Sequence, residues 1–257
     1  MKIFLKLIVG WRKTNDFYQK NPTPPKITEQ VLNIKSLESW KNLPETDSQG
    51  VRNYFEQLDK SVIRNALYNE QHGLCAYCMR KIHNDETMTI EHFTPIKKSK
   101  DGALDYKNML GCCDGGRRSD KSPKYLSCDA SKADEQITIS PFNKMQIEDL
   151  KYTFNGKILT KSGDKAIEHD LNETLHLNGI LDKKGNIQHD TSTSLVWNRK
   201  EVYKSYCDYM EGLERKYKNN QAKIISHIKK RIDKLENSIV YEEFIGVWLY
   251  FLRRRIR

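Results

Sequence analysis

Leu74-Cys75-Ala76-Tyr77-Cys78 is the stretch on which the interpretation of this chain depends. Its two cysteines are separated by two residues, a spacing that lets both thiolates of one tight turn bind a single tetrahedral ion. A second pair is needed to close such a site, and the candidates downstream are Cys112, Cys113 and Cys128. Because neighbouring side chains rarely converge on one metal, either Cys112 or Cys113 is expected to be spare. The sequence therefore predicts a structural zinc with four cysteine ligands.

The same cysteines have two other interpretations. A lone C-x2-C can be a redox pair, but no βαβ pattern surrounds Cys75 and Cys78, and further cysteines follow them. The clustered cysteines could also be unligated core residues. Zinc is the preferred interpretation, and zinc held by four thiolates has no open position, so any catalysis must lie beside it. Cys207 lies in a helical stretch and is expected to be a packed or surface thiol.

The chain carries more positive than negative charge. Lys and Arg number 44 against 34 Asp and Glu, which gives a formal net charge of +10 at pH 7 over 257 residues. A positive field attracts polyanions, so nucleic acid is the leading class of partner. Charge alone does not separate this class from an ordinary basic protein. The length allows one sizeable core or two small ones, which suits a single module with helical additions.

Neither end of the chain predicts a secretory leader or a membrane span. Lys6 divides the apolar run of MKIFLKLIVG, and no small-residue cleavage site follows before Trp11-Arg12-Lys13. A short strand is expected there instead. The apolar run from Phe244 to Leu252 is far shorter than the ~20 residues that a span requires. The expected compartment is the cytoplasm, where reducing conditions favour clustered cysteines as metal ligands, and no membrane partner is expected.

The first half of the chain divides into two segments. Residues 1–50 are expected to hold the N-terminal strand and a Pro-rich linker at Asn21-Pro22-Thr23-Pro24-Pro25, where proline fixes φ and disfavours helix before it. Residues 51–140 hold the clustered cysteines. Helical spacing of apolar residues predicts one amphipathic helix from Val51 to Glu70, and Thr87 to His92 is β-prone.

The second half also divides into two segments. Residues 141–195 are expected to hold a hairpin and a connecting segment. The hairpin is Lys151 to Thr160, because Asn-Gly stands between two β-rich arms and both turn residues tolerate positive φ. Residues 196–257 are almost free of Gly and Pro and rich in Lys, Glu, Tyr and Leu, which predicts two or three helices.

Between the expected cysteine pairs lie residues that match a known nuclease pattern. They are Glu91-His92, at the end of a β-prone run, then Asn108, and then Cys128-Asp129 with Lys132 three residues further on. In this order the chain resembles the HNH endonucleases, which have an acid–His pair, a middle Asn, and a last His or Asn directly after a zinc cysteine. Asp129 departs from that last position. The resemblance implies an α+β fold, a zinc-stapled ββα-metal (HNH, His-Me finger) nuclease core in residues 51–140 surrounded by mainly C-terminal α-helices.

The residue types suit hydrolysis of a phosphodiester. A neutral imidazole with a pKa near ~6.5 can take the proton of an attacking water, and His92 is the expected general base. A partly hydrated Mg2+ or Mn2+ would stabilise the leaving oxygen, and Glu91 and Asp129 are the expected ligands of this catalytic ion. Side chains of neighbouring strand residues diverge, so Glu91 and His92 serve one phosphate only if the strand ends or bends at Phe93-Thr94-Pro95.

Two further roles come from the resemblance alone. It implies that Asn108 holds the loop that orients His92, and that Lys132 lies near a phosphate on a helix starting around Asp129. Each residue taken singly has a plainer interpretation: Glu91-His92 as solvated surface, Asn108 as a turn residue, Asp129 as a helix N-cap. Their occurrence together, in family order and interleaved with four suitably placed cysteines, favours the nuclease.

A longer part of the chain, roughly Val51 to Leu181, is similar to one subgroup, the PtuB-type HNH proteins of Septu and retron antiphage systems. The stretches that carry this similarity are Gln71-His72-Gly73-Leu74-Cys75-Ala76-Tyr77-Cys78, Ile90-Glu91-His92-Phe93-Thr94-Pro95, Asn108-Met109-Leu110-Gly111-Cys112-Cys113-Asp114-Gly115-Gly116, Cys128-Asp129 and Thr174-Leu175-His176-Leu177-Asn178. In that subgroup a cysteine directly precedes the Asp/Asn-Gly-Gly turn. The resemblance therefore favours Cys113 over Cys112 as a zinc ligand, beside Cys75, Cys78 and Cys128.

The subgroup also implies a partner. Proteins of this kind act beside a PtuA-like ATPase, in retron systems together with a reverse transcriptase and its msDNA, so the ATPase would control when the nuclease fires. The aromatic-rich run from Tyr241 to Phe251, followed by Arg253-Arg254-Arg255, could dock that partner. Its plainer interpretation is an amphipathic core helix with a solvated basic end.

Three functions are therefore weighed. The first is a regulated, metal-dependent endonuclease of DNA or RNA. The second is a catalytically inactive, zinc-stapled module that binds nucleic acid, for which Asp129 would be a sign of decay, although Asp is itself a competent ligand for Mg2+. The third is a thiol redox or zinc-sensing protein, which would bind no polyanion even at low salt.

Overall fold

The computed structural model describes residues 20–119, 122–218 and 220–256, and the strand expected in the first ten residues lies outside these ranges. The helices are α2 (Pro25–Ser36), α3 (Glu38–Lys41), α4 (Ser48–Phe55), α5 (Lys60–Glu70), α6 (Cys128–Lys132), α7 (Lys144–Asp149), α8 (Lys165–His169), α9 (Leu195–Tyr217), α10 (Gln221–Glu236) and α11 (Ile245–Arg254). The strands are β1 (Thr89–His92), β2 (Met109–Cys112), β3 (Leu150–Tyr152), β4 (Ile158–Thr160), β5 (Ile180–Leu181) and β6 (Ile187–His189). Short helical turns are η1 (Ile96–Lys98), η2 (Asp101–Ala103), η3 (Tyr106–Asn108), η4 (Pro123–Tyr125) and η5 (Asp170–Thr174).

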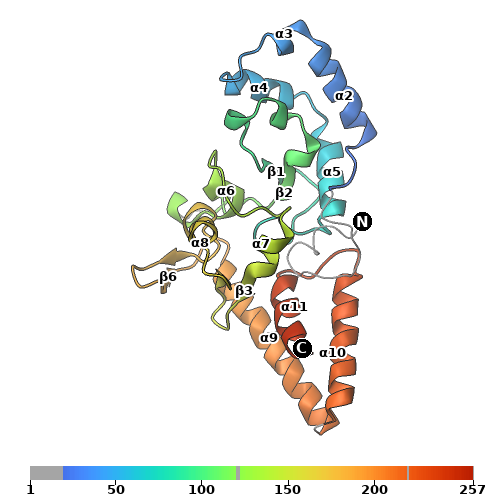
Figure 1. Cartoon of the computed structure of the whole chain (residues 1–257), viewed down its shortest axis with the longest axis vertical. Coiled ribbons are helices and arrows are strands. Elements are labelled where there is room, and N and C mark those ends of the chain that lie inside the picture. The colour runs from blue at the N-terminus through green and yellow to red at the C-terminus, as the bar shows by residue number, and fades with distance from the viewer. Residues whose placement is uncertain (1–19, 120–121, 219, 257) are drawn as a thin grey trace.

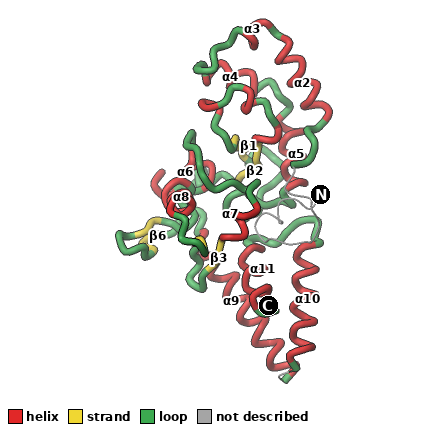
Figure 2. Tube along the Cα trace, viewed as in Figure 1, coloured by secondary structure: helices red, strands yellow, loops and turns green. Residues whose placement is uncertain are grey.

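The molecule is elongated, and its elements follow the chain from one end to the other (Figure 1). Helices α2, α3 and α4 lie at one end, the long helices α9 and α10 with α11 lie at the other, and β1, β2 and α6 lie between them (Figure 1). The strands form three separate antiparallel pairs, β1-β2, β3-β4 and β5-β6. Figure 2 shows that these pairs are small beside the helices and loops, so the described chain mixes helices with small sheets.

The N-terminal segment is more helical than expected. The extended stretch ends at Pro24, and α2 begins at Pro25. Proline is well suited to the first position of a helix, because the amide proton that it lacks would have no partner there. Ile27 and Ile34 of α2 are buried, so the helix is held by packing on the core rather than left as a linker.

The single helix expected from Val51 to Glu70 is wrong, because two helices occupy this range. Helix α4 ends at Phe55, and α5 starts after Asp59. The carboxylate of Asp59 accepts hydrogen bonds from the backbone N–H groups of Ser61 and Val62, which are free donors at the start of α5. The apolar period continues across the break, which is why the pattern alone did not reveal it.

Strands β1 and β2 place the segment that ends in Glu91 and His92 beside the segment that leads to Cys113. They pair antiparallel, with Glu91 opposite Leu110 and His92 opposite Met109. Of the β-prone run predicted at Thr87 to His92, Thr89 to His92 form a strand, and it ends at His92. Helix α6 follows after a long connection, so this part of the chain has the order strand, strand, helix.

The hairpin predicted at Lys151 to Thr160 is confirmed by β3 and β4. Gly156 in its turn has φ of +85°, and a Cβ there would lie 2.2 Å from the carbonyl oxygen of Val196 at the start of α9. The buried Arg199 of α9 donates from Nε to the carbonyl oxygen of Gly156 at 2.7 Å and from Nη2 to that of Leu177. The hairpin is thus fixed against α9.

The C-terminal region forms three helices, at the upper limit of the prediction. Helix α11 buries Ile245, Val247, Leu249 and Leu252 almost completely, so it is a core helix of the described structure. The hydrophobic core runs without interruption from Ile27 of α2 to α11. Within the described residues, no helix combines the length and the apolar character needed to cross a membrane.

Candidate functional site

Four buried cysteines meet at one point. The sulfur atoms of Cys75, Cys78, Cys113 and Cys128 all lie within 4.8 Å of one another. Sγ of Cys113 is 3.7 Å from that of Cys78 and 3.8 Å from that of Cys128. Four sulfurs at ~2.3 Å from one tetrahedral ion would lie about 3.8 Å apart, whereas a disulfide needs ~2.05 Å. The four thiols could therefore hold a metal such as zinc.

The backbone positions each of these cysteines. A tight turn carries Cys75 and Cys78, because the Cys75 carbonyl accepts from the Met79 N–H and the Cys75 N–H donates to the Arg80 carbonyl. Met79 has φ of +65°, which closes the turn. Cys128 opens α6, with its N–H donating to the carbonyl oxygen of Leu175 at 3.0 Å.

The two adjacent cysteines, Cys112 and Cys113, have different places in the structure. Cys113 follows the end of β2 and belongs to the four, while Cys112 is the last residue of β2 and pairs in the ladder with Thr89. Burial raises the pKa of the Cys112 thiol, which lies beside Cys75. Cys207 is half-buried on α9 and is not one of the four.

A buried glutamine links the cysteine turn to β2, and sequence reasoning did not single it out for this role. Nε2 of Gln71 donates to the carbonyl oxygens of Leu74 at 2.8 Å and Gly111 at 2.7 Å. Its Oε1 accepts from the Gly111 N–H at 2.6 Å. No local pattern marks such a residue, because both of its partners are backbone atoms. The first cysteine pair is thereby held in register with the strand that leads to Cys113.

Glu91 lies in a buried, charged cluster beside the cysteines. Its Oε1 is 2.7 Å from Nζ of Lys132 and accepts a hydrogen bond from the hydroxyl of Tyr77 at 3.1 Å. Burial and the neighbouring carboxyl group of Asp129 raise the pKa of Glu91 to about 8, although the Lys132 ammonium acts in the opposite direction. Two carboxyl groups that oppose each other's ionisation favour a cation between them.

Asp129 and Lys132 both come from α6. Asp129 has 10% of its side chain exposed, and its Oδ2 is 2.8 Å from Nη1 of Arg117. Lys132 has no exposed side chain, and Nζ also donates to the carbonyl oxygen of His92 at 3.3 Å. The expected place of Lys132 near a phosphate thus differs from the place found, since its ammonium is sealed against Glu91. Arg117 was missed, because an arginine after a Gly-Gly turn reads as exposed surface.

His92 ends β1 with its ring held in a fixed direction. Nε2 is 3.0 Å from the carbonyl oxygen of Ala103, and the edge of the ring meets Phe55 with centroids 4.6 Å apart. A carbonyl only accepts, so Nε2 carries the proton and Nδ1 keeps its lone pair. Burial lowers the pKa of His92 to about 4, so the imidazole is neutral at pH 7.

Asn108 ties the loop that carries Ala103. Its Nδ2 donates to the carbonyl oxygens of Thr94 and Gly102, each at 2.9 Å, and its Oδ1 accepts from the Thr94 N–H at 2.7 Å. Gly102 directly precedes Ala103, whose carbonyl oxygen holds the His92 ring. Asn108 therefore fixes the loop on which the direction of the imidazole depends.

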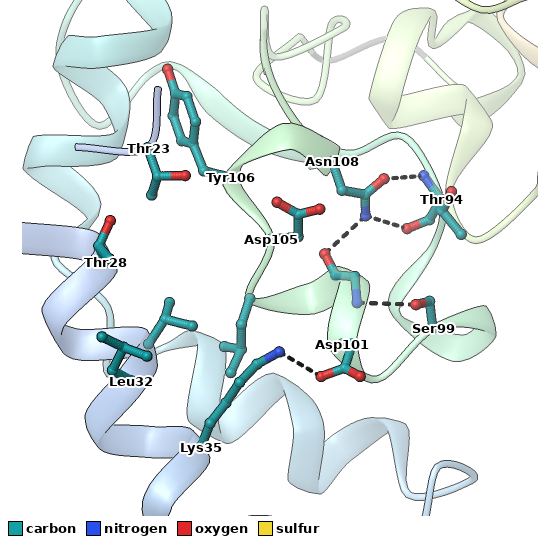
Figure 3. Close-up of a pocket in the computed structure, with 13 residues that line it drawn as sticks. Thr23, Thr28, Leu32, Lys35, Thr94, Ser99, Asp101, Asp105, Tyr106 and Asn108 are labelled. Carbon is teal, nitrogen blue, oxygen red and sulfur yellow. Dashed lines mark hydrogen bonds and ion pairs between the residues drawn. The ribbon is translucent and has the colours of Figure 1, made fainter. Parts of the chain in front are cut away.

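A pocket of about 560 Å3 lies on the outer side of the same loop. Figure 3 shows one wall made by Thr94, Asp101 and Asn108 and the facing wall made by α2, with Lys35 reaching across to Asp101. Nζ of Lys35 is 2.7 Å from Oδ1 of Asp101. The polar groups of Asn108 in this wall are occupied by the loop itself, so they serve the loop rather than a ligand.

The structure thus brings Glu91, Asp129 and Lys132 together beside the four cysteines, and the neighbouring His92 ring is close enough for the charges of Asp129 and Lys132 to act on its pKa. In the described part of the chain, only the four cysteines form a group of three or more metal-binding side chains. Glu91 and Asp129 are two interacting carboxyl groups. No protein-family model matches the chain, and no curated protein matches it.

Proposed function

We propose that this chain is a metal-dependent endonuclease of the HNH type, which hydrolyses phosphodiester bonds of nucleic acid. The observation that carries the proposal is the anchored, neutral imidazole of His92 beside the carboxyl pair of Glu91 and Asp129. A general base and an anionic pair for a divalent ion are the two parts that such a hydrolysis needs. The order β1, β2, α6 supports a ββα-metal core.

Each residue has a defined task in this proposal. Nδ1 of His92 takes the proton of the attacking water, because Nε2 is committed to the Ala103 carbonyl. Oxygens of Glu91 and Asp129 would hold Mg2+ or Mn2+, which supplies charge neutralisation at the leaving oxygen when bound. Lys132 positions Glu91, and Asn108 positions the loop that holds His92.

The four-cysteine site would hold a structural zinc. Cys75, Cys78, Cys113 and Cys128 offer four thiolates at the spacing of a tetrahedral ion, which leaves no position for substrate. Its contribution is to hold the turn before β1, the end of β2 and the start of α6 in one arrangement. The carboxylates that come from β1 and α6 then face each other.

The resemblance to PtuB-type proteins extends the proposal to regulation. We expect the nuclease to act as the effector of an antiphage defence system under a PtuA-like ATPase, with a retron reverse transcriptase and its msDNA as further partners. An unregulated nuclease would damage the nucleic acid of its own cell. The working compartment in this proposal is the cytoplasm.

The test uses the zinc-loaded protein with plasmid DNA and cellular RNA in Mg2+ or Mn2+, with and without a PtuA-like ATPase. Cutting should require the added ion, and His92→Ala should abolish it while the zinc content stays unchanged. Equal cutting by His92→Ala and the parent would contradict the proposal.

One observation favours a second candidate, the inactive nucleic-acid-binding module. Both carboxyl groups of the pair already have a cationic neighbour, Lys132 for Glu91 and Arg117 for Asp129. If these cations take the place of the ion, the protein binds nucleic acid but does not cut it in any divalent metal, alone or with the ATPase. The same experiment separates the two candidates.

A further inference from the structure

The excess positive charge of this chain is concentrated away from the candidate site. Residues 51–140 contain 14 basic and 13 acidic residues, whereas residues 195–257 contain 15 basic and 8 acidic residues. The second range covers α9, α10 and α11, the arm at the far end of the molecule from α2 (Figure 1). Most of the formal charge of +10 therefore lies on the arm.

Three arginines of the arm form ion pairs with glutamates of the arm. Arg215 pairs with Glu211 at 3.0 Å, Arg231 with Glu242 at 2.8 Å, and Arg255 with Glu214 at 2.6 Å. Arg231 also lies over the ring of Trp248, 4.8 Å from its centroid. The pairs of Arg231 and Arg255 join separate segments of the arm, and the pair of Arg215 lies within α9, so each of these arginines already has an acidic partner.

Three lysines of α10 are different. Lys223, Lys230 and Lys234 are exposed, and within the described residues none of their ammonium groups has a hydrogen-bond or ion-pair partner. At 100° per residue the three side chains fall within about 40° of one another around the helix, so they form a single stripe. The stripe has steps of about 10 Å and 6 Å along the axis.

The helix backbone that carries the stripe is held in place, because another side of α10, about 120° around the helix, is anchored. Ile224, Ile228 and Leu235 are buried on the face that meets the rest of the arm. The first turn is capped by Asn220, whose Oδ1 accepts from the Lys223 N–H at 3.1 Å. The hydroxyl of Tyr209 on α9 donates to the His227 carbonyl at 3.3 Å. A fixed row of unpaired cations is suited to a polyanion rather than to single acidic side chains.

We infer that the stripe formed by Lys223, Lys230 and Lys234 binds the sugar-phosphate backbone of nucleic acid, away from the cutting centre. Its length of about 16 Å matches about five phosphates of one strand of a B-form duplex at ~3.4 Å each. Lysine contacts to phosphate carry no sequence information, so this surface fixes the position of a long substrate without reading bases. The inference rests on the proposed function, because it takes nucleic acid as the substrate class.

The test measures binding of a fluorescent 20-base-pair duplex, and of one of its single strands, by anisotropy over a range of salt. The background is full-length, zinc-loaded His92→Ala protein without added Mg2+. We expect Lys223→Gln/Lys230→Gln/Lys234→Gln to weaken duplex binding about 10- to 100-fold at low salt. The slope of log affinity against log salt should fall by roughly 0.9 per lysine removed.

The matched control is Lys161→Gln/Lys183→Gln/Lys184→Gln, which removes the same charge from exposed positions on another part of the surface. It should keep the salt slope of the parent. Equal losses in both triple variants would mean that only net charge matters, and no loss in the α10 variant would mean that the stripe serves another partner; either result overturns the inference. Gln is a good helix former, and single substitutions, each with its own fall in slope, replace the triple variant if it does not fold.

The two proposals fail separately. Normal affinity of the α10 triple variant together with ion-dependent cutting by the parent would overturn the stripe and leave the nuclease. Loss of affinity in the variant together with no cutting by the parent would overturn the nuclease and leave the stripe.

Discussion

Nζ of Lys132 lies 2.7 Å from Oε1 of Glu91, in a place where neither side chain is exposed by more than 6%. The lysine comes from α6 and the glutamate from β1, so this contact joins the two elements that carry the candidate ligands. A buried pair of this kind adds little net stability, but removing one partner leaves the other without compensation. The contact therefore fixes how β1 and α6, which carry the candidate ligands, lie relative to each other.

At pH 9, where Glu91 is ionised because its pKa is about 8, Glu91→Gln is expected to destabilise the protein by about 3 kcal/mol, since it leaves the fully buried ammonium of Lys132 without an anion. Lys132→Met should cost less at this pH, because the lysine ammonium lowers the pKa of Glu91, and without it the carboxyl group takes up a proton more readily and stays neutral. The double variant should recover part of the loss of Glu91→Gln. Urea unfolding of the parent, the two single variants and the double variant gives a double-mutant cycle of unfolding free energies. Equal losses of unfolding free energy in the two single variants would contradict this account.

Cys113→Ser is expected to lower the zinc content of the purified protein and its unfolding temperature, because one of four converging thiolates is lost. Cys112→Ser is the matched control, since that buried cysteine is its neighbour and is not one of the four. It should retain about one zinc per chain. Mass spectrometry measures the zinc content of both variants, and equal zinc loss in both would contradict the assignment of the four ligands.

Added Mg2+ is expected to raise the melting temperature more at pH 8.5 than at pH 6.5. The pKa of Glu91 is raised to about 8 in the folded protein, so its proton stabilises the fold at low pH, and that stability is lost as pH rises through about 8. The ion binds the deprotonated carboxylate, so it stabilises the folded protein more at a pH where Glu91 has lost its proton. Glu91→Gln should flatten the pH dependence, while Glu45→Gln, at an exposed position, should keep it.

Asn108→Ala is expected to slow cutting by about 10- to 100-fold with zinc content unchanged, since the loop that holds the His92 ring loses three hydrogen bonds. Asn143→Ala is the matched control, because its side chain caps α7 with two hydrogen bonds away from the loop. Both variants should lose about 1 kcal/mol or more of stability. If Asn143→Ala slowed cutting as much, the effect of Asn108 would be one of stability alone.

Local patterns predicted those elements whose cause is local. The turn at Gly156 requires positive φ, and the C-x2-C pair at Cys75 and Cys78 needs only one tight turn, so both were readable from sequence. The break at Asp59 was missed, because a capping carboxylate looks like any polar residue inside an amphipathic period. The start of α2 at Pro25 was missed for a similar reason, since a proline run favours extended chain until packing decides.

The candidate site was less predictable than the elements that carry it. Which of Cys112 and Cys113 joins the four depends on how β2 ends, and the burial of Lys132 depends on the packing of α6 against β1. Arg117 reaches Asp129 across a turn whose shape no single residue specifies. Such contacts are long-range, and they exist only once the whole core has formed.

The hydrogen bond from the Cys128 N–H to the Leu175 carbonyl has a consequence for synthesis of the protein. The ribosome releases Glu91 and His92 well before Leu175, and Arg199, which holds the neighbouring Leu177 carbonyl, later still. A growing chain therefore carries its acid–histidine pair while the start of α6 still lacks its anchor. The described site is completed only when the hairpin and α9 have left the ribosome, so the order of synthesis delays its assembly until α9 has been made.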